Sequence, residues 1–125
     1  MVQKNYGRQS AVSLEENLKK AITELLILQL LSQREYYIGE ITQAISDKSG
    51  GALNVVFPYA AIYRMEEAGH IMELPRRIAP DGRRRQYFSI TPEGLAYLAQ
   101  LRNVYATVTG GVAKILTEGT VTDES

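Results

Sequence analysis

A short helical pattern that ends in glycine and leads into an arginine-tipped hairpin constrains this chain more than any other feature. The pattern covers 58–68, with proline at its start, and stops at Gly69, a residue suited to a left-handed helix cap. Strand patterns follow over 70–77 and 84–90, and the loop between them contains Pro80-Asp81-Gly82, which has turn chemistry. A DNA-reading helix followed by a phosphate-contacting wing would have this order.

The composition indicates one ordinary globular domain. The chain has 125 residues, of which 45% are apolar, 8% aromatic and 22% charged. It has no cysteine, which excludes disulfides, thiolate nucleophiles and cysteine zinc sites. The formal net charge is zero at pH 7. A neutral total can still contain a basic face, because five arginines cluster along the hairpin: Arg76, Arg77, Arg83, Arg84 and Arg85.

Nothing in the sequence resembles a membrane span or a secretion signal. The longest strongly apolar stretch, 25–31, contains Gln29 and is far shorter than the roughly 20 residues that cross a bilayer. The first ten residues contain two cations but no apolar run with a cleavage site. We therefore expect no membrane association and a cytoplasmic location.

Two further helical patterns precede the short one. A capping box over 13–16 predicts a helix from Ser13 to about Ser32, which leaves 1–12 as an expected flexible arm. The second half of this helix is apolar on nearly every side, so it should lie at the centre of the domain or also pack on another subunit. A second helix is predicted from Ile38 to about Lys48, with a short connection before it.

A fourth helix is predicted after the hairpin, with Thr91 as its cap and Pro92 at its first position. Its apolar residues recur at three- and four-residue spacing: Leu95, Leu98, Leu101, Tyr105 and Val108. Gly110-Gly111 should interrupt it, so 13–109 form the domain and 110–125 a short helical turn and a disordered acidic tail. The leucine stripe predicts a homodimer that buries it together with the first helix.

The order of three helices, two strands and one helix predicts a mainly α fold with a small β-hairpin. This is a winged helix-turn-helix with amino- and carboxy-terminal dimerisation helices. In such a motif the second helix enters the major groove near its amino-terminal half. Since Ile62 and Met65 should face the core, the residues left for DNA are Tyr59, Ala60, Tyr63 and Arg64. Packing of the tyrosines against the wing is the alternative.

The wing tip is the second candidate DNA-binding element. Arg83, Arg84 and Arg85 alternate in direction along a strand, so two of them should lean toward DNA. Guanidinium groups suit phosphate oxygens and a narrow minor groove. The alternative is a solvated turn that keeps the hairpin edge soluble, and Arg76 and Arg77 are weaker candidates on the opposite strand.

The sequence indicates no catalytic, metal or cofactor site. His70 is the only histidine, and no Asp, Glu or His spacing around it resembles a metal site. Without a second histidine or a cysteine, no nucleophile and base pair can be nominated. We expect a protein that is not an enzyme and that has no cofactor.

Three segments in this order and spacing resemble the PadR family of bacterial transcription regulators, in its short form with one carboxy-terminal helix. They are 25–41 with its Leu-Leu-Ile-Leu-Gln-Leu-Leu run, 59–71 (Tyr-Ala-Ala-Ile-Tyr-Arg-Met-Glu-Glu-Ala-Gly-His-Ile), and 84–94 (Arg-Arg-Gln-Tyr-Phe-Ser-Ile-Thr-Pro-Glu-Gly). The resemblance covers about residues 14–108. It implies a homodimeric repressor whose two recognition helices face a palindromic operator in double-stranded DNA.

The resemblance also implies a small aromatic effector, bound between the subunits in some short members. Tyr105 falls where such members carry an aromatic residue at the dimer centre, and Tyr97 and Leu101 are its neighbours. Packing explains these three residues equally well. Tyr59 matches the recognition-helix tyrosine of the family, whereas Phe57-Pro58 departs from the usual pair before it.

Two functions from different classes follow from the sequence. The first is a dimeric, sequence-specific repressor. The second is a winged-helix dimeric protein-interaction module without DNA readout, which the neutral charge and the acidic pair Glu66-Glu67 favour. Placement of the arginines remote from the recognition helix would support the second.

Overall fold

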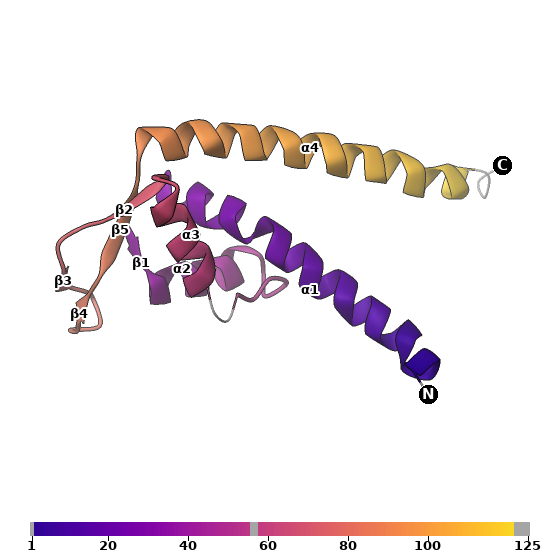
Figure 1. Ribbon diagram of the computed structural model, residues 1–125, viewed down its shortest axis with the longest axis horizontal. Coiled ribbons are helices and arrows are strands. Elements are labelled where there is room, and N and C mark those ends of the chain that lie inside the picture. Colours follow the sequence, from indigo (N-terminus) through magenta and orange to yellow (C-terminus); the bar gives the residue numbers. More distant parts are fainter. Residues whose placement is uncertain (1, 56–57, 122–125) are drawn as a thin grey trace.

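Two long helices at opposite ends of the chain frame a small helical and β-sheet unit (Figure 1). The computed structural model describes residues 2–55 and 58–121. Its helices are α1 (Val2–Leu31), α2 (Ile38–Lys48), α3 (Tyr59–Glu67) and α4 (Pro92–Val121). The first half of α4 packs beside the second half of α1, and beyond this contact the two helices diverge toward the chain ends (Figure 1).

The strands form two small sheets, because each predicted strand of the hairpin is divided into two short ones. One contains β1 (Tyr36–Tyr37), β5 (Tyr87–Ile90) and β2 (Ile71–Glu73), in the antiparallel order β1-β5-β2. The other contains β3 (Arg77–Ile78) and β4 (Arg84–Arg85) and forms the wing tip. The segment predicted as a connection before α2 is therefore the strand β1, which pairs Tyr36 with Phe88.

The second half of α1 lies at the centre of the domain, which is one of the two placements predicted for it. Ile27 and Leu28 have no solvent exposure, and each such side chain stabilises the fold by about 1.5–3 kcal/mol. They pack with Ile41 of α2, Met65 of α3 and Phe88 of β5. The core therefore fixes the two helices of the helix-turn-helix and the wing against one central helix.

The mainly α fold with a small hairpin is confirmed, and α2 ends before Ser49 as predicted. The Thr91 cap is also confirmed, because its Oγ1 accepts a hydrogen bond from the Gly94 N–H at 3.0 Å. The predicted extents of the two long helices are wrong. Helix α1 begins at Val2, so Ser13 lies inside it and residues 2–12 are helical rather than a flexible arm. Propagation of a formed helix needs no apolar face, only residues that tolerate helical geometry.

The predicted break at Gly110-Gly111 is also wrong, because α4 continues through both glycines to Val121. Each glycine costs a helix about 1 kcal/mol relative to alanine, which the flanking turns of an established helix can offset. The short turn predicted after residue 110 is thus part of one 30-residue helix. Residues 122–125 of the predicted acidic tail lie outside the described residues.

Candidate nucleic-acid interface

Helix α3 presents one buried face and one exposed face, and the structure divides its residues as predicted. Ile62 and Met65 are buried in the core. Tyr59 and Tyr63 are 60% and 63% exposed, and Ala60 and Arg64 are also exposed. The four residues nominated for DNA contact therefore share the solvent-facing side of the helix. Buried Pro58 precedes the first turn as its cap residue rather than occupying the first helical position.

The end of α3 is tied to the start of α4. Gly69 adopts φ 79°, which lets the chain turn sharply from α3 into β2. The Thr91 Oγ1 donates to the Gly69 carbonyl at 2.6 Å, and the Thr91 N–H donates to the His70 carbonyl at 3.0 Å. The His70 ring stacks on Tyr97, with ring centroids 4.3 Å apart and planes 14° from parallel. These contacts set the orientation of α3 relative to α4.

The turn at the wing tip is held by Asp81. Its Oδ1 accepts from the Arg83 N–H at 3.0 Å, and Gly82 adopts φ 84°, which only glycine takes without strain. The Ala79 N–H donates to the Arg83 carbonyl at 2.8 Å and closes the loop. The predicted turn chemistry of this segment is therefore present, and it supports a tip of fixed shape.

Arg85 is held within the wing. Its Nη2 lies 2.6 Å from Asp81 Oδ2, and its guanidinium lies 5.0 Å from the centroid of the Tyr37 ring. The hydrogen bond with Asp81 raises the pKa of Arg85, and the same bond, with the Arg83 N–H, lowers the pKa of Asp81. Arg85 therefore connects the turn at the wing tip to the Tyr37 ring, and its side chain is only partly exposed.

A similar arrangement holds Arg77. Its Nη1 lies 2.7 Å from Glu35 Oε1, and its guanidinium lies 3.6 Å from the centroid of the Tyr87 ring. The rings of Tyr37 and Tyr87 meet edge to face at 5.5 Å. Arg85, Tyr37, Tyr87 and Arg77 thus form a continuous column that stiffens the wing where its two sheets meet.

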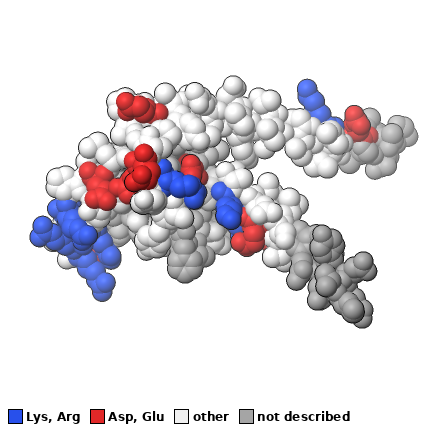
Figure 2. All heavy atoms as spheres, in the orientation of Figure 1, with Lys and Arg blue, Asp and Glu red and all other residues white. Residues whose placement is uncertain are grey.

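Arg83 and Arg84 extend from the tip, and their guanidinium groups form no hydrogen bond or ion pair among the described residues. Figure 2 shows Lys and Arg side chains gathered at this end of the molecule, over β3 and β4. The predicted trio of arginines therefore separates into one structural residue, Arg85, and two exposed cations. Which of the three arginines lean toward DNA stays a prediction.

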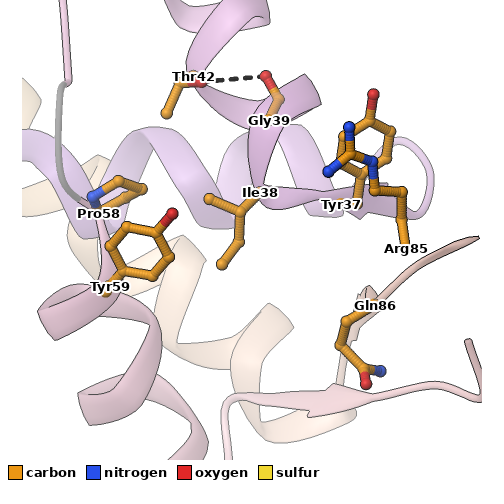
Figure 3. A pocket seen from close by; sticks show the side chains of 8 residues that line it. All are labelled: Tyr37, Ile38, Gly39, Thr42, Pro58, Tyr59, Arg85 and Gln86. Atoms are coloured by element: carbon orange, nitrogen blue, oxygen red, sulfur yellow. Dashed lines mark hydrogen bonds between the residues drawn. The ribbon is translucent and has the colours of Figure 1, made fainter. Parts of the chain in front are cut away.

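A pocket of about 310 Å³ connects the wing to the helix-turn-helix (Figure 3). Tyr59 and Pro58 line it from the start of α3, and Arg85 and Gln86 line it from the wing. The start of α2 supplies the remaining lining residues: Tyr37, Ile38, Gly39 and Thr42. The first turn of α2 has backbone N–H groups without helical acceptors and a positive dipole end, both of which favour an anion nearby.

The sequence did not indicate these α2 residues. A Cβ at Gly39 would lie 2.9 Å from the Tyr37 ring that supports Arg85, so a larger residue there must displace this ring. The Tyr-Ile-Gly sequence at a helix start contains both residues, but the close approach of the Tyr37 ring to Gly39 is known only from the fold.

An acidic pair marks the other end of α3. Burial raises the pKa of Glu66, and the adjacent Glu73 of β2 raises it further. Glu66 lies in the last turn of α3, which also contains Arg64, and Glu73 ends the strand β2 that follows. These carboxylates repel a phosphate backbone, so the surface suited to DNA is the exposed face of α3 that contains Tyr59, Ala60, Tyr63 and Arg64, together with the wing tip.

The three residues nominated for an effector lie along one side of α4 but have different surroundings. Tyr97 is stacked on His70, and Leu101 packs against the core. Tyr105 lies farther along the helix and is 47% exposed. The first two therefore already have contacts within the subunit, whereas Tyr105 belongs to an uncovered surface.

That uncovered surface is an apolar stripe with a heptad repeat. Alternate three- and four-residue steps connect Leu98, Leu101, Tyr105, Val108, Val112 and Ile115, and the last four are exposed. Leu14 and Leu18 of α1 are exposed as well, at 61% and 56%. Apolar faces of this length are typical of helices that pack against another chain.

Residues 27–100, more than half of the chain, match the model of the Transcriptional regulator PadR-like family. The chain belongs to this family. PadR-like proteins are DNA-binding transcriptional regulators rather than enzymes, which confirms the family and the general class predicted from the sequence.

Solved structures place this PadR-like regulator among winged-helix proteins. It is 26% identical to a transcriptional regulator from Clostridium thermocellum, with a TM-score of 0.68, over 78% of this chain and 93% of that one. A PadR family regulator from Eggerthella lenta has the same fold at 19% identity, with a TM-score of 0.72, over 89% and 96% of the two chains. The predicted winged helix-turn-helix is confirmed.

A protein of Lysinibacillus sphaericus described as uncharacterized is 32% identical over 85 residues, which are 66% of this chain and 77% of that protein. Within the described residues, no helix of this PadR-like regulator is long and apolar enough to cross a membrane. The described part of the chain also contains no group of three histidine, aspartate or glutamate residues that could hold a metal ion.

Proposed function

We propose that this PadR-like regulator is a dimeric repressor that binds a palindromic operator through the starts of α2 and α3 and the wing tip. The observation that carries the proposal is the shared pocket, in which Tyr59 of the recognition helix and Arg85 of the wing line one concave surface. A duplex placed against α3 would meet the first turn of α2 and the wing at the same time. The bacterial cytoplasm is the location that this role requires.

Each element has a distinct task in this proposal. Tyr59, Ala60, Tyr63 and Arg64 face the major groove, where hydroxyl and guanidinium groups can bond base edges and small residues permit close approach. Arg83 and Arg84 contact phosphates or the minor groove beside it. Arg85 holds the wing in place and contacts the DNA backbone only at the margin of the pocket. Phosphate contacts set the position of the protein, and base contacts set its specificity.

Dimerisation is supported by the heptad stripe of α4 and by the exposed leucines of α1. A second copy that places its α4 between the diverging helices would cover Tyr105, Val108 and Val112 together with Leu14 and Leu18. Such a pairing is symmetric, because each α4 packs on the partner's α1. Two recognition helices at fixed separation would then read two inverted half-sites.

An effector site at the dimer centre is the second part of the proposal. Tyr105 would present its ring to the seam, with Leu101 and Tyr97 behind it, where a flat aromatic compound could stack. Tyr97 also stacks on His70, which lies three residues after the end of the recognition helix. A ligand that moves α4 would therefore change the orientation of α3 and release the operator.

The alternative of a protein-interaction module predicted arginines remote from the recognition helix. Arg85 and Tyr59 instead line the same pocket, and the acidic residues lie at the opposite end of α3. This arrangement favours DNA over a protein partner.

A footprint on the intergenic DNA next to its own gene tests the proposal. We expect protection of two inverted half-sites whose centres are about 10 base pairs, or a multiple of that, apart on one face of the duplex. A variant that combines Tyr63→Ala with Arg64→Ala should lose the footprint but keep the dimer mass in sedimentation. Protection of one half-site, or none at low salt, would contradict the proposal.

A further inference from the structure

The recognition helix carries an ion pair that connects it to α1. Arg64 Nε donates to Glu24 Oε2 at 2.9 Å, across 40 residues of sequence. The Arg64 side chain is 57% exposed and that of Glu24 is 25% exposed. Glu24 forms no other hydrogen bond or ion pair among the described residues, so its carboxylate serves Arg64 alone.

The pair uses only one edge of the guanidinium group. A guanidinium is planar and rigid, so a bond at Nε fixes the plane and direction of the whole fork. The two terminal nitrogens of Arg64 form no hydrogen bond among the described residues and remain available. They are the donors that would recognise the O6 and N7 atoms of a guanine in the major groove.

Glu24 also changes the local charge. An unpaired arginine on α3 would be attracted to any phosphate, which raises binding to all sequences alike. A carboxylate 2.9 Å away offsets most of that attraction and leaves the directional hydrogen bonds. Because exposed ion pairs stabilise proteins little, the main effect of this one should appear in DNA recognition rather than in folding.

We infer that Glu24 is a specificity-determining positioning residue, which holds Arg64 as an oriented reader of a base edge and suppresses its binding to phosphate. The inference rests on the proposed function, since it requires α3 to enter the major groove. It assigns part of the sequence readout to α1, a helix outside the helix-turn-helix itself.

The test compares two affinities for each variant: one for duplexes that the wild-type protein enriches from a randomised pool, and one for a scrambled duplex, both by fluorescence anisotropy at about 0.1 M salt. Glu24→Ala should bind the scrambled duplex about threefold more tightly, since one negative charge is removed. It should lower the ratio of specific to non-specific affinity about tenfold, the scale of one bidentate base contact.

Two further variants separate orientation from charge. Glu24→Gln keeps an oxygen that can accept from Arg64 Nε, so it should bind all DNA more tightly yet retain a ratio near that of the wild type. Glu15→Gln is the matched control, because Glu15 pairs with Lys19 on the same helix at 2.9 Å without contacting α3. It should leave the ratio unchanged. Arg64→Ala and the double variant Glu24→Ala/Arg64→Ala should have equal ratios.

The outcomes distinguish the inference from the function on which it rests. If the wild-type protein prefers no sequence, the proposed function is wrong. If it does prefer one and Glu24→Ala leaves the ratio unchanged, the inference is overturned. It is also overturned if Glu24→Ala weakens both affinities equally and lowers the melting temperature, because Glu24 would then serve packing alone.

Discussion

Gly94 in the first turn of α4 is a position where alanine should damage the fold, although alanine is the better helix former. A Cβ built there lies 2.1 Å from the His70 carbonyl oxygen and 2.7 Å from Ile90 Cγ1. The first obstacle is backbone, so no side-chain rotation can relieve it. Gly94→Ala must therefore push α4 away from the His70 carbonyl, which precedes β2, and weaken the 3.0 Å hydrogen bond from Thr91 to His70.

The magnitude follows from three opposing contributions. The alanine gains about 1 kcal/mol in helix propensity. Overpacking costs about 1–3 kcal/mol, and a contact this short with a rigid group belongs at or above the upper limit. Loss of the Thr91 hydrogen bond costs about 1 kcal/mol more. We expect a net destabilisation of about 2–4 kcal/mol, or roughly 10 °C in melting temperature for a chain of this size.

Gly110 provides a matched control in the same helix, since a Cβ at that position has nothing within 4 Å. Gly110→Ala should stabilise the protein by about 0.5–1 kcal/mol. Urea unfolding followed by circular dichroism measures both variants, at one fixed protein concentration because dimerisation adds to stability. Equal stability of Gly94→Ala and the wild type would refute the close approach of Gly94 to the His70 backbone.

Three other predictions concern the dimer, the wing and the effector. Val108→Asp should raise the dimer dissociation constant at least about 100-fold in sedimentation, because it places a carboxylate in an apolar seam, while Asn103→Asp on the opposite side of α4 should not. Carboxyl NMR should give Asp81 a pKa below its ordinary value of 3.8. The Asp81 carboxylate therefore stabilises the wing fully above pH 3.8, and this stabilisation is lost as the pH falls through the lowered pKa of the folded protein. Arg85→Ala should return that pKa toward 3.8, and an unchanged value would contradict the pair. Flat aromatic compounds should raise the melting temperature, and Tyr105→Ala should abolish the increase; unchanged melting across such compounds would count against an effector site.

Local chemical signals allowed most of the fold to be predicted. Glycine after α3, the turn at 80–82 and the Thr91 cap are each decided within a few residues, and the structure contains all three. Helix lengths were harder to predict, because propagation through Gly110-Gly111 depends on the turns on both sides rather than on the glycines alone.

The candidate site depended more on contacts distant in sequence. The exposed face of α3 followed from helical periodicity. The separation of Arg85 from Arg83 and Arg84 followed only in part: Asp81, which binds Arg85, is four residues away in the same turn, whereas Tyr37 lies far away in the chain and meets the wing only after β1 pairs with β5. The ion pair between Glu24 and Arg64 could not be predicted either, because no sequence pattern connects these two residues.

The salt dependence of DNA binding tests most directly the claim that the wing tip and α3 form one DNA-binding surface. For the wild-type dimer, the logarithm of the affinity should fall steeply with the logarithm of the salt concentration. Replacing Arg83 and Arg84 by alanine in both subunits removes four cations, which should reduce the slope by about 3 to 4. An equally steep slope for the variant, or a flat slope for the wild type, would contradict the account.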